Sequence, residues 1–262
     1  MISPLPKPPC PFPPKPLPGP KSKRLPKGKP LTIAASFQIA DGIVFCADRM
    51  MSYEQSAYYE LKLFNARGSN FSAVAVAASD DMITAKSVIR GFFDGVVGGH
   101  TNFHAENLQN ALEGCLKVKL ESVQDPNMFL IMAFMRDEGD YYVLSSHNTS
   151  VNQASPCEIV GIGDVSLVRY ITDSLYRVGL TLKQGVALAA YVIWAAKKYC
   201  PMYCGGDTDI WVLSKSTPQS SALWRIIPQA AIRRAEELIE SHRKEHLENF
   251  LSFICRSIEF FT

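Results

Sequence analysis

The feature that most constrains this sequence is an abrupt change in composition just before Thr32. Twelve of the first thirty residues are proline, and the same stretch holds seven basic side chains and no acidic one. Proline fixes φ and has no amide N–H, and this stretch contains too little apolar bulk to form a core. We therefore expect residues 1–31 to be a disordered, basic leader rich in polyproline II, and the fold to begin at Thr32.

Two roles for the leader remain open. It could be a ligand for an SH3-type domain or a basic tether, because a preformed polyproline II helix suits both. It could equally be a propeptide, a linker or an upstream translation extension with no binding role. Composition alone does not separate these alternatives.

The charge and cysteine content exclude several classes of protein. The whole chain has a net charge of +2, but residues 31–262 carry 20 basic and 25 acidic side chains, so the core gives no case for nucleic-acid binding. No apolar run is long enough to cross a membrane, and the N-terminus lacks a secretory h-region. Seven cysteines in 262 residues do not make a disulfide scaffold. We expect a cytoplasmic protein.

The core alternates groups of strand-like segments with pairs of helical ones. Sheets packed on each other and covered by helices follow from this order, which fits a four-layer αββα sandwich or a less regular α+β fold. We expect the core to span residues 32–228 and an amphipathic helix to occupy residues 229–262. The predicted strands are 32–37, 42–47, 61–65, 71–78, 128–136, 141–145, 158–161, 209–214 and 223–227. The predicted helices are 80–93, 105–120, 165–176, 182–199 and 229–255.

Four residues at the start of the core form an ordered pattern. Thr32 opens the first strand, Gly42 follows the turn to the second, Asp48 closes that strand, and Lys62 precedes the next. In sequence these segments read TIAASF, DGIVFCADR and ELKLF, and they resemble the opening of a proteasome β-type subunit, an N-terminal nucleophile hydrolase with an αββα fold. Three later segments, residues 160–163, 170–176 and 203–213, resemble the C-terminal half of the same family.

The resemblance implies a role for each matched residue. Thr32 would be the nucleophile, Lys62 would favour loss of its hydroxyl proton, and Asp48 would orient the lysine by a charge-assisted hydrogen bond. A backbone N–H in a run of small residues after the fourth strand would stabilise the oxyanion, and Ala78 or Ala77 stands there in place of the usual glycine; we take Ala78 as the donor. The family requires neither a metal nor an organic cofactor. Taken without the family, Asp48 and Lys62 also fit an ordinary surface ion pair.

The chain departs from the family pattern around the threonine. Ile162 stands where a serine is usual between two glycines, and Pro201 and Cys204 stand at the supporting Asp and Ser positions. The polar surroundings of the threonine are therefore thinner or differently made. Leu31 replaces the glycine that usually precedes the threonine, and Thr32 gains a free α-amine only if the bond after Leu31 is cleaved.

The sequence leads to one main functional hypothesis and two rivals. The main hypothesis is a threonine-type peptide-bond hydrolase that acts through Thr32 on peptides or unfolded proteins, in a ring-forming homo-oligomer served by an unfoldase. The first rival is a non-catalytic structural subunit with the same fold. The second is an adaptor that displays the proline-rich arm on an inert core.

Two other pairs of residues are weaker candidates for a functional site. His242 and His246 lie one helical turn apart, a spacing that can bind zinc, but both lie in a charged helix with no evident third ligand. We interpret them as part of a solvated helix face. Cys200 and Cys204 do not have zinc-ribbon spacing, and we interpret them as structural thiols.

Overall fold

A computed structural model describes residues 32–53, 56–99, 104–162, 166–201, 204–215 and 223–258. The predicted leader, residues 1–31, lies outside the described residues, as do Gly163 and Tyr203 of the matched segments. Within the described part of the chain, no helix combines the length and the hydropathy that crossing a bilayer requires.

The first sheet is antiparallel and contains the N-terminal hairpin. Its turn at Gly42 requires glycine, because φ is +153° and an added Cβ would lie 2.1 Å from the carbonyl oxygen of Leu213. The strands, in spatial order, are β10 (Cys157–Ile162), β1 (Thr32–Ile39), β2 (Gly42–Asp48), β11 (Thr208–Ser214) and β12 (Leu223–Ile226).

The second sheet is also antiparallel and consists of five strands joined in sequence order. Every residue of its second strand is buried, as expected for a strand with a layer packed on each face. In order, the strands are β5 (Leu63–Arg67), β6 (Phe71–Ser79), β7 (Met128–Arg136), β8 (Tyr141–His147) and β9 (Ser150–Gln153). A separate two-stranded sheet pairs β3 (Met50–Tyr53) with β4 (Ser56–Tyr59).

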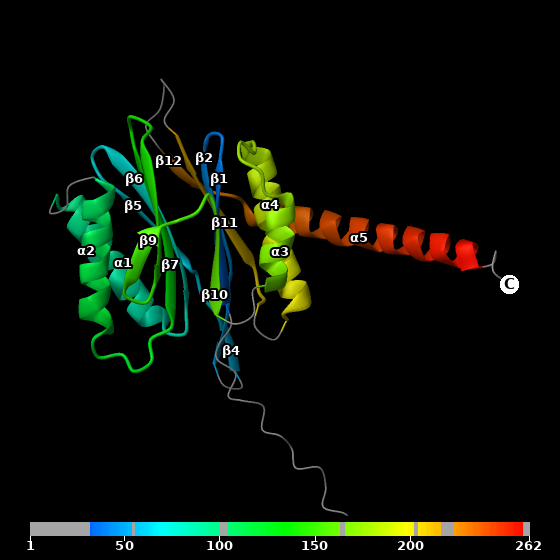
Figure 1. Ribbon diagram of the computed structural model, residues 1–262, viewed down its shortest axis with the longest axis horizontal. Coiled ribbons are helices and arrows are strands. Elements are labelled where there is room, and N and C mark those ends of the chain that lie inside the picture. Colours follow the sequence, from blue (N-terminus) through cyan, green and yellow to red (C-terminus); the bar gives the residue numbers. More distant parts are fainter. Residues whose placement is uncertain are drawn as a thin grey trace, which may run out of the picture.

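Two pairs of helices cover the outer faces of the two sheets (Figure 1). Side-chain caps define where two of them begin, since Asp81 accepts from the amides at the start of α1, and Thr181 forms a capping box with Gln184 at the start of α4. The pair on the second sheet is α1 (Met82–Val97) and α2 (Ala105–Leu120); the pair on the first is α3 (Ser166–Leu175) and α4 (Leu182–Tyr199).

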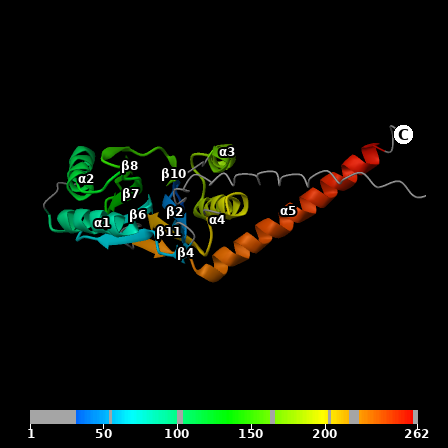
Figure 2. The same ribbon diagram turned by 90° about the horizontal axis from the view of Figure 1, so that it is seen from below.

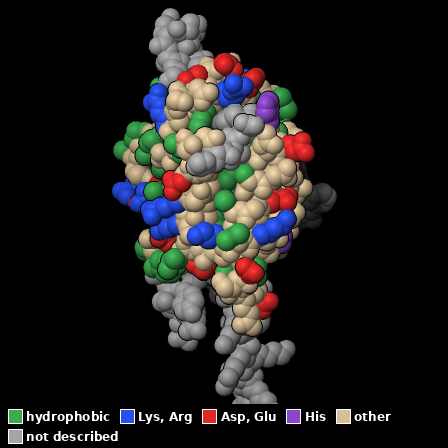
Figure 3. All heavy atoms as spheres, turned by 90° about the vertical axis from the view of Figure 1, so that its left-hand side faces the viewer, with side chains coloured by type: hydrophobic (Ala, Val, Ile, Leu, Met, Phe, Trp, Pro, Cys, Tyr) green, Lys and Arg blue, Asp and Glu red, His purple; other side chains and the backbone are tan. Residues whose placement is uncertain are grey.

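Three buried clusters show the order of the layers. One lies between α1, α2 and the second sheet, and another between the first sheet and α3 and α4. The third lies between the two sheets and includes Phe45, Ile131 and Trp211. The predicted four-layer αββα sandwich is therefore confirmed. On the outer face of α1 and α2, side chains of both charges are interspersed (Figure 3).

Helix α5 (Gln229–Ile258) leaves the sandwich and extends away from it (Figures 1 and 2). Its first turns pack against α4 and β11, where Ile232 is buried. The sequence predicted this helix, but it did not predict the short strands β3, β4 and β9. Each of these has only four residues, which is too short for an alternation of apolar and polar residues to stand out.

Candidate active site

Thr32, Asp48 and Lys62 meet at one end of the sandwich. Thr32 is the first residue of β1 and Asp48 is the last of β2. The antiparallel hairpin therefore brings them to the same end of the sheet. Lys62 directly precedes β5 in the opposite sheet. Their exposed fractions are 1%, 0% and 0%. An ordinary surface ion pair between Asp48 and Lys62 is therefore excluded.

The Lys62 ammonium is the centre of this cluster. Its Nζ donates to Thr32 Oγ1, to Asp48 Oδ1 at 2.7 Å and to the carbonyl oxygen of Met50 at 2.7 Å. Thr32 Oγ1 in turn lies 3.3 Å from Asp48 Oδ1, to which it donates. The hydroxyl thus has a cation on its oxygen and an acceptor for its proton, which is the arrangement that an activated hydroxyl nucleophile needs.

Backbone amides hold the Asp48 carboxylate in place. Oδ2 accepts from the amides of Met50 at 3.2 Å and Gly205 at 3.0 Å, and Oδ1 lies 3.4 Å from the amide of Ile33. These donors come from three different segments, so the position of the carboxylate depends on the packing of all three.

Burial governs the ionisation of Lys62. Removal from water lowers the pKa of the Lys62 ammonium, and the negative charge of Asp48 opposes that shift without cancelling it. The negative charge of Asp209, in β11, acts on Lys62 in the same direction as that of Asp48. The result is an ammonium that loses its proton more easily than that of a surface lysine, beside the Thr32 hydroxyl.

The residues that depart from the family pattern have different positions here. Ile162 pairs with Thr32 in the register of β10 and β1, whereas Pro201 is exposed. Cys204 is buried, and burial raises the pKa of its thiol well above the ordinary value, so the thiol is neutral. The amide of Gly205, the next residue, supplies a polar contact to Asp48 that the sequence did not predict.

The turn that carries Gly205 is fixed on both sides. The carbonyl oxygen of Gly205 accepts from the Met50 amide and that of Asp207 from the Arg49 amide, both at 3.1 Å. Gly206 has φ +71°, and an added Cβ would lie 2.6 Å from the ring of Tyr59. The turn therefore fits closely against the chain that follows Asp48.

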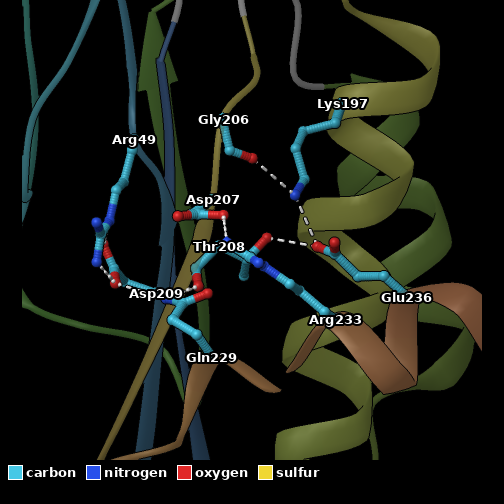
Figure 4. A network of polar contacts seen from close by, with 9 residues as sticks. All are labelled: Arg49, Lys197, Gly206, Asp207, Thr208, Asp209, Gln229, Arg233 and Glu236. Atoms are coloured by element: carbon cyan, nitrogen blue, oxygen red, sulfur yellow. Dashed lines mark hydrogen bonds and ion pairs between the residues drawn. The ribbon is translucent and has the colours of Figure 1, made fainter. Parts of the chain in front are cut away.

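Side chains from α4 and α5 complete this arrangement (Figure 4). Arg49 forms a bidentate ion pair with Asp209, at 2.7 and 2.8 Å. Gln229 of α5 donates to the carbonyl oxygen of Thr208 at 2.8 Å. Glu236 of α5 accepts from Thr208 Oγ1 at 2.6 Å and from the Lys197 ammonium at 2.7 Å.

The hydrogen bonds at the end of β6 show which way the amide of Ala78, the predicted oxyanion donor, faces. The Ala77 amide donates to the carbonyl oxygen of Lys62 at 3.0 Å. The Asp80 amide donates to the carbonyl oxygen of Asn127, on the β7 side, at 3.4 Å. Successive amides of a strand point to opposite sides. The Ala78 amide therefore faces β7, and the Ser79 amide faces the side of Lys62.

The remaining candidates form no second site. The rings of His242 and His246 lie 4.5 Å apart, and His242 lies 3.7 Å from Glu245 on an exposed face. Within the described part of the chain, no group of three or more His, Cys, Asp or Glu side chains is placed to hold a metal ion. Cys200 and Cys204 are not joined by a disulfide.

The fold has counterparts among solved structures. No protein-family model and no curated protein sequence matches the chain. The chain is similar to a Gly-1 mutant of Anbu from Hyphomicrobium sp. strain MC1, with a TM-score of 0.67 and 13% identity over 83% of this chain and 96% of that one. It also resembles Anbu, described as an ancestral beta-subunit, from Yersinia bercovieri, with a TM-score of 0.67 and 12% identity over 84% and 97%.

A third similar structure is the helical assembly of the Anbu complex from Pseudomonas aeruginosa, with a TM-score of 0.66 and 14% identity over 84% of this chain and 96% of that one. The chain has the proteasome-subunit fold. At these identities the similarity establishes the fold alone, so the chemistry has to be argued from the residues of this chain.

Proposed function

We propose that this protein is a threonine-type peptide-bond hydrolase that acts through Thr32 once the residues before it have been removed. The observation that carries the proposal is the buried contact of the Lys62 ammonium with both the Thr32 hydroxyl and the Asp48 carboxylate. A hydroxyl, a cation and a carboxylate gathered without solvent at the first residue of the fold serve no evident packing purpose. Their arrangement suits nucleophilic catalysis.

The first step is acyl transfer to Thr32. Oγ1 attacks the carbonyl carbon of a peptide bond, and its proton passes to the α-amine that cleavage after Leu31 would free. Such an amine titrates near neutrality, at about 7.7–8.0, so it can accept the proton. The amine then gives a proton to the leaving nitrogen as the C–N bond breaks, which leaves an ester between the substrate and Thr32. Lys62 offsets the negative charge that develops on Oγ1.

The second step returns the enzyme to its starting state. Water attacks the ester carbonyl, the amine again accepts a proton, and the C–O bond to Thr32 breaks as the hydroxyl is restored. The substrate leaves as a carboxylic acid. Every proton transfer in both steps uses the amine, so the retained leader blocks the whole cycle.

The oxyanion of both steps needs a backbone donor near Thr32. The sequence pointed to Ala78, but the alternation of amides along β6 favours Ser79, because the Ser79 amide faces the side of Lys62. A backbone donor contributes through its position and not its side chain. We therefore propose Ser79 in this role in place of Ala78.

We also propose that the protein assembles with copies of itself, so that the active sites are enclosed. This rests on the similarity to a subunit of the Anbu complex, whose assembly is helical, and it leaves open whether this chain forms a ring or a helix. Peptides or unfolded proteins are the substrates that an enclosed site admits, and delivery by an unfoldase partner belongs to the same proposal.

Intact mass, N-terminal sequencing and a peptidase assay of the purified full-length protein test the proposal together. We expect a new N-terminus at Thr32 and cleavage of unstructured peptides that Thr32→Ala abolishes. Thr172→Ala is the control, since Thr172 is also buried but donates only to a carbonyl oxygen within α3. A chain that stays intact, with a peptide turnover that Thr32→Ala does not change, contradicts the proposal.

A further inference from the structure

We infer that Glu236 of α5 is a positioning residue for the active site, acting through the turn that donates the Gly205 amide to Asp48. The inference rests on the proposed function, because it concerns how the same site is held. It extends that function to a helix whose outer half projects away from the sandwich (Figure 2).

The first link runs from Glu236 to the turn. Its Oε1 accepts from Thr208 Oγ1 at 2.6 Å and from Lys197 Nζ at 2.7 Å, and Lys197 also donates to the carbonyl oxygen of Gly206 at 3.1 Å. One carboxylate therefore fixes the turn twice, directly at Thr208 and through Lys197 at Gly206. Figure 4 shows these contacts converging from α4, α5 and β11.

The second link runs from the turn to the catalytic carboxylate. Gly205 donates its amide to Asp48 Oδ2 at 3.0 Å and accepts the Met50 amide through its carbonyl oxygen at 3.1 Å. Met50 in turn accepts from the Lys62 ammonium through its own carbonyl oxygen at 2.7 Å. A shift of the turn must therefore change the surroundings of both charged residues beside Thr32.

A parallel path joins the same turn to α5 from the other side. Asp209, almost wholly buried, is held by Arg49 and by Gln229 Nε2 at 3.2 Å. Asp209 is also one of the negative groups that act on Lys62, together with Asp48. The first turns of α5 are thus connected to the active site in two ways. Gln229 contacts Asp209, and Glu236 holds the turn that carries Gly205.

This arrangement takes the place of the polar supports that the sequence lacks. Pro201 is exposed and the Cys204 thiol is a weak donor, so neither side chain can replace a supporting aspartate or serine. The Gly205 amide takes this supporting role instead, through its hydrogen bond to Asp48. The position of that amide depends on the position of the turn that carries it. Glu236, which lies 31 residues after Gly205 in the chain, holds this turn in position.

The test compares Glu236→Gln with Glu240→Gln in the full-length protein. Glu240 lies one helical turn along α5, where it accepts from Lys198 and Arg243, both at 3.1 Å. These contacts lie away from the turn at Gly205. The two substitutions remove the same charge from neighbouring positions. Lysine labelled with ¹³C at Cε lets the titration of Lys62 be followed by NMR, with Lys62→Met assigning its signal.

We expect Glu236→Gln to lower the titration midpoint of Lys62, because a looser Asp48 attracts the ammonium less, and Glu240→Gln to leave it unchanged. In peptide cleavage we expect kcat to fall about tenfold with KM unchanged, since a misplacement of about 1 Å can cost up to about a hundredfold. The alkaline limb of the kcat profile should move to lower pH, which a loss of stability alone would not cause.

An unchanged Lys62 midpoint in folded Glu236→Gln overturns the inference, whatever happens to stability. If that variant does not fold, Thr208→Val replaces it, because it removes one of the two contacts and keeps the shape of the side chain. The midpoint must then move in the same direction, and an unmoved one overturns the inference. The NMR titration needs no turnover, so a wild-type protein without peptidase activity would refute the proposed function and leave this test intact.

Discussion

Two ion pairs in this molecule have the same length and opposite surroundings. Lys62 and Asp48, the central pair of the candidate active site, lie 2.7 Å apart inside one end of the sandwich, and both side chains are 0% exposed. Lys197 and Glu236, the outer pair, lie 2.7 Å apart beneath α5, and their side chains are 18% and 20% exposed. The desolvation penalty of a buried pair can exceed its Coulomb attraction. The difference in burial supports the proposal that the central pair serves catalysis, while the outer pair holds two helices against a turn.

The largest effect should come from breaking the central pair. Lys62→Met leaves the Asp48 carboxylate buried without a cation, and loss of one partner of such a pair costs about 3–5 kcal/mol. We expect that loss in the free energy of unfolding, measured with denaturant, together with loss of peptide cleavage.

The matched control for this loss is Lys198→Met. Lys198 pairs with Glu240 at 3.1 Å in a half-exposed place, where an ion pair contributes about 0–1 kcal/mol. Equal losses from Lys62→Met and Lys198→Met would mean that depth makes no difference, and the comparison would fail.

A smaller effect should come from the turn that joins the two regions. Gly206 and Gly99 both have positive φ, +71° and +75°, but an added Cβ meets the Tyr59 ring at Gly206 and nothing within 4 Å at Gly99. Alanine in the left-handed region costs about 1–2 kcal/mol at either position. At Gly206 overpacking adds about 1–3 kcal/mol. Thermal unfolding of the two alanine variants measures the difference, and equal melting temperatures would show that the turn does not fit closely against Tyr59.

The smallest effect should be a pH dependence of stability that belongs to the central region. Burial lowers the pKa of Lys62 below its ordinary value of 10.5. Between the lowered pKa and 10.5 the folded state binds fewer protons than the unfolded state, so the free energy of unfolding rises with pH across that window. The difference between the wild type and Lys62→Met should therefore grow as pH approaches 10.5. A difference that shrinks there would reverse the sign and contradict the burial of Lys62.

The sequence predicted the layers of the fold and the three side chains of the candidate active site, because both leave local signals. Apolar runs marked the strands, and the order of Thr32, Asp48 and Lys62 matched a known pattern. The groups that hold these three side chains in place left no such signal. The Gly205 amide, and the Ser79 amide in its proposed role, belong to the backbone, and every residue other than proline has such an amide. Glu236 is one of several acidic residues on a charged helix, and only the packing of α5 on β11 distinguishes it from Glu240.

The most direct test of the central claim is whether Thr32 is the residue that carries the acyl group. A β-lactone acylates an activated hydroxyl through ring opening, and tandem mass spectrometry then locates the ester. We predict one ester, on Thr32 with a free α-amine, in the wild type and in Glu240→Gln, and none in Lys62→Met. An ester that forms elsewhere, or that forms equally in Lys62→Met, would contradict the account.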